Sequence, residues 1–236
     1  MRLASVLLNE SPTELTTAAT DAAMAILCVV ALARLAHLHV HARWKRTLWS
    51  WVLALLGLAS VIGALAHGLT WSAAARATLW PPLYLLLGLS VTLFLVGGIY
   101  DWRGEAAARR ILPWAVGAGV GFCPLIALLG GTFLIFIMFD TAAMLAALAI
   151  YGVLAASRRV VGAALVTAGI ALTIVAGAVQ ASHLSVQLVV PFDHNGLFHL
   201  LQLVATTILV TGLRRGLMND SAGGPVPVRK HKPSAV

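Results

Sequence analysis

The chain has 236 residues, of which 60% are hydrophobic and only 10% are charged, and its formal net charge at pH 7 is +8. A soluble domain carries about 25% charged residues, so this composition excludes an ordinary water-soluble fold. The positive charge does not indicate nucleic-acid binding, because the basic residues stand in short runs between apolar stretches, as in the cytoplasmic loops of membrane proteins.

Seven stretches are long and apolar enough to cross a bilayer as helices. The hydrocarbon core is about 30 Å thick and a helix rises about 1.5 Å per residue, so a span needs about 20 residues. We therefore predict an all-α, polytopic membrane protein. Its transmembrane domain covers residues 1–215, and a disordered basic cytoplasmic tail follows over 216–236. The seven helices are expected at about 17–37, 48–68, 81–100, 111–129, 132–155, 160–181 and 194–213.

The loops predict the orientation of these helices. Lys and Arg gather after the first, third, fifth and seventh helices, whereas the alternate loops contain only Arg76. Positive loops stay in the cytoplasm, so we expect the N-terminus outside and the C-terminus inside. This distribution of basic loops is typical of a multi-pass protein of the cell inner membrane. Its expected partner is the lipid bilayer. No cleavable signal peptide is expected, because residues 1–16 are mixed and carry Glu10 and Glu14.

Histidines converge near the outer interface once this orientation is assigned. His67 lies at the outer end of the second helix, and His194 and His199 open the seventh. Three imidazoles at matched depth can bind Zn²⁺ and leave a fourth position for water. Water bound there acquires a pKa near 7 and can attack a carbonyl carbon. The sequence therefore suggests a zinc site with these three histidines as metal ligands.

Carboxylates lie within reach of the same layer. Asp21 shares one stripe of the first helix with Glu14 and Thr17, and Asp140 lies about 12 Å below the outer surface in the fifth. A buried carboxylate in a membrane must be paired or protonated, so each is a candidate functional residue. We predict Asp21 and Asp140 as catalytic acid or base, or as groups that orient a histidine. Asp193 either joins them or caps the seventh helix.

The chain resembles the alkaline ceramidase and progestin/adipoQ receptor superfamily in three features. It has seven helices, a histidine near the end of the second helix, and paired histidines at the start of the seventh. The resemblance implies a seven-helix zinc amide hydrolase or a relative of one. It assigns His67 as the helix-two ligand and His199 as the second helix-seven ligand. His194 stands five residues before His199, whereas the family pattern places its ligand four before, where this chain has Asn195.

Two further positions differ from the family pattern. The family serine four residues before the helix-two histidine falls on Gly63, and Ser60 lies one turn further back on the same face. The family also places an aspartate inside helix three, where this chain has none; Asp21 or Asp140 would replace it.

The leading hypothesis is an outer-leaflet pocket that hydrolyses a lipid amide or ester with zinc. A haem-binding electron-transfer protein, with His67 and His199 as axial ligands, is the alternative from another class. The third alternative is a non-enzymatic membrane protein whose polar layer only holds the helices together.

The predicted orientation can be tested directly with fusions at the C-terminus. A reporter that works only in the cytoplasm is expected to be active there, and one that works only outside the cell to be inactive, because the basic loops stay inside. The reverse pattern would overturn the orientation and the matched depth of the histidines.

Overall fold

The structure is a computed structural model that describes residues 7–130 and 133–221. Seven spans in these ranges are long and apolar enough to cross a membrane, as the sequence predicts. Their main helices are α1 (Pro12–Ala36), α2 (Arg43–Gly68), α4 (Trp80–Arg103), α5 (Glu105–Leu128), α6 (Phe133–Ala156), α7 (Ala163–Gln180) and α8 (His194–Ser221). The short α3 (Ala73–Ala77) precedes α4, and a hairpin of β1 (Val186–Gln187) and β2 (Pro191–Phe192) joins α7 to α8.

Several helices are longer than the apolar stretches predict. The first starts at Pro12, where Ser11 caps it by accepting a hydrogen bond from the backbone N–H of Glu14 at 3.5 Å. Helix α5 starts at Glu105, directly after Gly104, whose φ of +86° separates it from α4. Polar turns extend these helices beyond their apolar stretches, and a rule based on apolar length cannot detect them.

The predicted cytoplasmic tail begins inside a helix. Helix α8 continues through residues 216–221, and the remaining residues of the expected tail, 222–236, lie outside the described residues. Gly130, which follows α5, has a φ of +94°, which glycine adopts without a Cβ clash. The next residue, Gly131, also lies outside the described residues.

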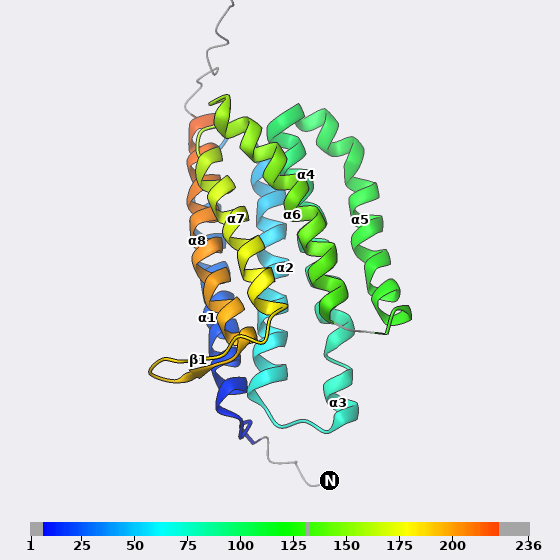
Figure 1. Ribbon diagram of the computed structural model, residues 1–236. Coiled ribbons are helices and arrows are strands. Elements are labelled where there is room, and N and C mark those ends of the chain that lie inside the picture. Colours follow the sequence, from blue (N-terminus) through cyan, green and yellow to red (C-terminus); the bar gives the residue numbers. More distant parts are fainter. Residues whose placement is uncertain (1–6, 131–132, 222–236) are drawn as a thin grey trace, which may run out of the picture.

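Six helices form a closed ring around the interior of the bundle. Helices α1, α2, α4, α6, α7 and α8 each pack against the next in this order, and α8 packs against α1. Helix α5 lies outside the ring at the edge of the molecule, against α4 (Figure 1). It also contacts α6 through Phe122 and Phe139, whose rings stack with centroids 4.4 Å apart. The interior is therefore bounded by six helices.

Polar backbone contacts close the end of the ring where α8 begins. The N-terminal segment lies beside the end of α2, where the backbone N–H of Asn9 donates to the carbonyl of Gly68 at 2.9 Å. The Asn9 side-chain amide donates to the carbonyl of His67 at 3.0 Å. On the opposite side, the Thr16 hydroxyl donates to the carbonyl of Pro191 at 3.0 Å and ties the hairpin to α1. The sequence did not predict this hairpin.

A buried charge cluster holds the other end of the bundle together. The ammonium of Lys45 lies 2.6 Å from a carboxylate oxygen of Asp101 and 3.0 Å from one of Asp220. Tyr151 donates its hydroxyl to Asp101 at 2.8 Å. The Lys45 and Asp101 side chains are each only 4% exposed. This Lys45 cluster joins α2, α4, α6 and α8.

Removing the cation of the Lys45 cluster is expected to destabilise the protein strongly. Lys45→Met leaves the buried carboxylate of Asp101 without its ion pair, which typically costs about 3–5 kcal/mol of unfolding free energy. Thermal unfolding in detergent measures this loss. The control is Glu105→Gln, which breaks an exposed pair with Arg109 and should cost about 0–1 kcal/mol. Equal melting temperatures for the two variants would contradict the role of the cluster.

Candidate functional site

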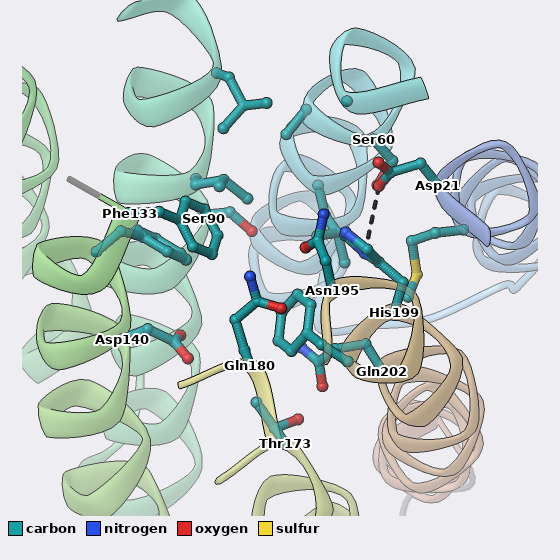
Figure 2. Close-up of a pocket in the computed structure, with 18 of the residues that line it drawn as sticks. Asp21, Ser60, Ser90, Phe133, Asp140, Thr173, Gln180, Asn195, His199 and Gln202 are labelled. Carbon is teal, nitrogen blue, oxygen red and sulfur yellow. Dashed lines mark ion pairs between the residues drawn. The ribbon is translucent and has the colours of Figure 1, made fainter. Parts of the chain in front are cut away.

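The ring of helices encloses a cavity of about 360 Å³. Residues from all six ring helices line it, and Figure 2 shows its interior. The five side chains that the sequence singled out all line this one cavity: Asp21, His67, Asp140, His194 and His199. They come from α1, α2, α6 and α8, so only the packing of the helices brings them to the same space.

Asp21 and His199 form the contact between the first and last helices of the ring. Nδ1 of His199 lies 3.4 Å from a carboxylate oxygen of Asp21, and the two side chains are 17% and 4% exposed (Figure 2). Gly63 of α2 provides the room, because a Cβ at that position would lie 2.5 Å from the Asp21 carboxylate. Glycine at position 63 is therefore a packing requirement of this pair.

His67 forms a second pair of the same kind. Its Nδ1 lies 2.7 Å from a carboxylate oxygen of Glu14, which also accepts a hydrogen bond from Arg76 at 3.1 Å. The edge of the Trp80 ring packs against the imidazole, with centroids 6.1 Å apart. Glu14 was not among the site residues predicted from the sequence, although it lies two turns before Asp21 on the same stripe of α1. This shared stripe is the sequence feature that could have identified Glu14 as a site residue.

In both histidine–carboxylate pairs, the carboxylate contacts Nδ1 of the imidazole and leaves Nε2 without a partner among the described residues. Nδ1 of His67 and Nδ1 of His199 both lie against a carboxylate, and no residue in the described ranges is a partner for either Nε2. A carboxylate on one ring nitrogen fixes the orientation of the imidazole ring. Each histidine of the two pairs therefore has one ring nitrogen without a partner among the described residues.

Asp193 caps α8, one of the two roles that the sequence left open. Its side chain accepts hydrogen bonds from the backbone N–H groups of Asn195 at 3.1 Å and Gly196 at 2.9 Å. The helix begins at His194. On a helix that is regular from this point, His194 and His199 project about 140° apart around the axis. Both line the cavity, but from different directions.

A catalytic zinc normally has three protein ligands. Within residues 7–130 and 133–221, no group of three or more His, Cys, Asp or Glu side chains could hold a metal ion. The described residues therefore do not fit the three-histidine zinc site that the sequence suggests. His67 and His199 meet the same cavity as separate histidine–carboxylate pairs.

Uncharged polar side chains and apolar walls complete the cavity. Ser60, Thr173 and Thr206 are 5–6% exposed and make no hydrogen bond to any described residue. The side-chain amide oxygens of Gln180 and Gln202 are buried and have no partner in the described part of the chain. Sequence reasoning missed most of these residues, because Ser and Thr are common in membrane helices. The apolar lining includes Leu83, Leu87, Phe94, Phe133, Phe136 and Met144.

Comparison with known proteins gives one match. The model of a family of unknown function, DUF6962, matches residues 16–218. The chain belongs to this family. No curated protein and no solved structure matches the chain. The DUF6962 match covers most of α1 and α8, the other ring helices in full, and every cavity residue named above except Glu14, so the cavity lies almost entirely within the family region.

Gly63 gives a direct test of the Asp21–His199 pair. Gly63→Ala should displace the Asp21 carboxylate and lower stability by about 1–3 kcal/mol, the usual cost of overpacking. Adding Asp21→Ala should recover part of that loss, because it removes the clash. Thermal unfolding in detergent measures both effects. Gly117→Ala on α5 is the control, since nothing lies within 4 Å of a Cβ there. Equal melting temperatures for Gly63→Ala and Gly117→Ala would contradict the predicted clash.

Proposed function

We propose that this protein binds one amphipathic lipid in the cavity and hydrolyses an ester or amide bond in it. The observation that carries the proposal is the pair of carboxylate-supported imidazoles, His67 and His199, on a single cavity with polar and apolar walls. The apolar walls suit a hydrocarbon chain, and the polar end suits the head group to which the scissile bond belongs.

The chemistry requires one base and one acid. One imidazole accepts a proton from a water molecule as that water attacks the carbonyl carbon, and the other donates a proton to the departing alcohol or amine. The bond between the carbonyl carbon and the leaving oxygen or nitrogen breaks, giving a carboxylic acid and an alcohol or amine. Asp21 and Glu14 hold the two rings in position and stabilise the imidazolium that forms.

The cavity lining disfavours the haem alternative. A haem carries two propionate groups, and no Lys or Arg is found among the described residues that line the cavity. Glu14, Asp21, Asp140 and Asp193 line it instead and would repel those groups.

We also propose an orientation and a membrane for this reaction. The basic loops favour an outside N-terminus, and the cavity histidines lie at the end of the bundle where α2 ends and α8 begins. In a cell inner membrane this orientation places the scissile bond in the outer leaflet.

The hydrolase proposal is tested with the purified protein in lipid vesicles and long-chain fluorogenic esters and amides. His199→Ala and His67→Ala should each lower kcat/KM by about 100- to 10,000-fold, the usual contribution of general acid–base catalysis. The matched control is His183→Ala, because His183 is exposed and does not line the cavity.

Three results would change this proposal. The proposal would be refuted if the His67→Ala and His199→Ala variants turned over substrate as fast as the wild-type protein. It would also be refuted if the wild-type protein hydrolysed no ester or amide. Loss of activity with a chelator and recovery with Zn²⁺ would replace the metal-free mechanism with the zinc-dependent one that the family resemblance implies.

A further inference from the structure

Asp140 is the cavity residue that the acid–base pairs do not explain. It is the only charged residue in α6, the most apolar of the spans, with a mean hydropathy of 2.3. It lines the cavity, and no described residue donates a hydrogen bond to its carboxylate or forms an ion pair with it. Ionisable groups inside a membrane are costly and almost always have a partner. We therefore expect the partner of the Asp140 carboxylate to be a ligand bound in the cavity.

The other carboxylates of the cavity lining already have partners. Glu14 pairs with His67 and Arg76, and Asp21 pairs with His199. The fourth cavity carboxylate, Asp193, accepts two backbone hydrogen bonds as the cap of α8. Asp140 is thus the only one of the four without a donor in the described part of the chain.

The side chains around the cavity also lack donors. Gln180 and Gln202 each have a buried amide oxygen without a partner, and the Thr173 hydroxyl makes no hydrogen bond among the described residues. Figure 2 shows these three side chains in the view between Asp140 on α6 and His199 on α8. Buried acceptors are normally satisfied, so a ligand that brings several N–H or O–H donors suits this part of the cavity.

The charged and apolar side chains that line the cavity indicate which class of ligand it can bind. No Lys or Arg lines the cavity in the described ranges, and Arg76, beside the lining Glu14, already pairs with that carboxylate, so a carboxylate or phosphate group would find no unpaired Lys or Arg there. An ammonium offers three donors and a positive charge. Phe136 lies one turn before Asp140 on the same face of α6 and also lines the cavity. Its aromatic ring is a favourable neighbour for a cation.

We propose that Asp140 binds the ammonium group of a long-chain amine, so that the lipid held in this cavity is a cationic amphiphile. The chain of the amphiphile lies against the apolar walls, and its ammonium lies on α6, across the cavity from the Asp21–His199 pair. The inference rests on the cavity as a lipid-binding site, which is part of the proposed function, but it does not depend on hydrolysis.

The experiment compares three probes of equal chain length: a primary amine, an alcohol and a fatty acid. Their affinities for the full-length protein in non-ionic detergent are measured by native mass spectrometry and by thermal stabilisation. The amine should bind about tenfold more tightly than the alcohol, the difference expected from a charge-assisted hydrogen bond, and the fatty acid most weakly. Equal or tighter binding of the fatty acid by the wild-type protein overturns the proposal.

Variants assign this preference to Asp140. Asp140→Asn should remove the preference for the amine over the alcohol, whereas Asp140→Glu, which retains the carboxylate, should keep it. Glu105→Gln is the charge-matched control, because it removes an exposed carboxylate outside the cavity and should leave all three affinities unchanged. An amine preference that survives Asp140→Asn overturns the proposal.

A further variant separates this inference from the hydrolase proposal. Asp21→Asn should lower ester or amide turnover and leave the amine preference in place. An amine preference without any turnover would refute the hydrolase and support the inference about Asp140. Turnover without an amine preference would refute the inference about Asp140 and leave the hydrolase in place.

Discussion

Polar side chains cannot face the hydrocarbon of a bilayer without a large cost in free energy, and this constraint shapes the whole molecule. Helices satisfy their own backbone groups, so the spans themselves are stable in lipid. Side chains such as Asp21, Asp140 and His199 must instead turn toward the interior of the bundle. Six helices packed in a ring provide one interior, and the polar groups of all six meet there.

The two ends of the ring use polar groups in different ways. In the Lys45 cluster, the ammonium and the buried Asp101 carboxylate contact each other and further partners on α6 and α8. A cluster whose groups satisfy one another holds helices together and leaves nothing for a ligand. In the cavity, by contrast, the carboxylate of Asp140 and the amide oxygen of Gln180 lack partners among the described residues. This contrast is the physical reason for assigning a structural role to one end and a binding role to the other.

Within the cavity, the same carboxylate chemistry has two distinct uses. Asp21 and Glu14 lie against the Nδ1 atoms of His199 and His67, and they orient rings whose Nε2 atoms have no partner among the described residues. Asp140 orients nothing in the described part of the chain and faces the cavity alone. A lipid with a cleavable bond near the histidines and an ammonium at Asp140 would satisfy both sets of groups at once. The geometry of the pairs depends on small features such as Gly63, which leaves room for the Asp21 carboxylate.

The sequence by itself determined the membrane class and the seven spans, and it singled out five of the residues that line the cavity, because apolar length and the cost of buried charge act locally along the chain. It did not determine the true helix ends at Pro12 and Ser221, since polar turns add no apolar signal. Only the tertiary structure decided which groups pair. His67 pairs with Glu14 and His199 with Asp21, and the described residues contain no group of three or more His, Cys, Asp or Glu side chains that could hold a metal ion. Those choices depend on the rotation of each helix and on the order of the helices around the ring, and both are set by side-chain packing between residues far apart in the sequence.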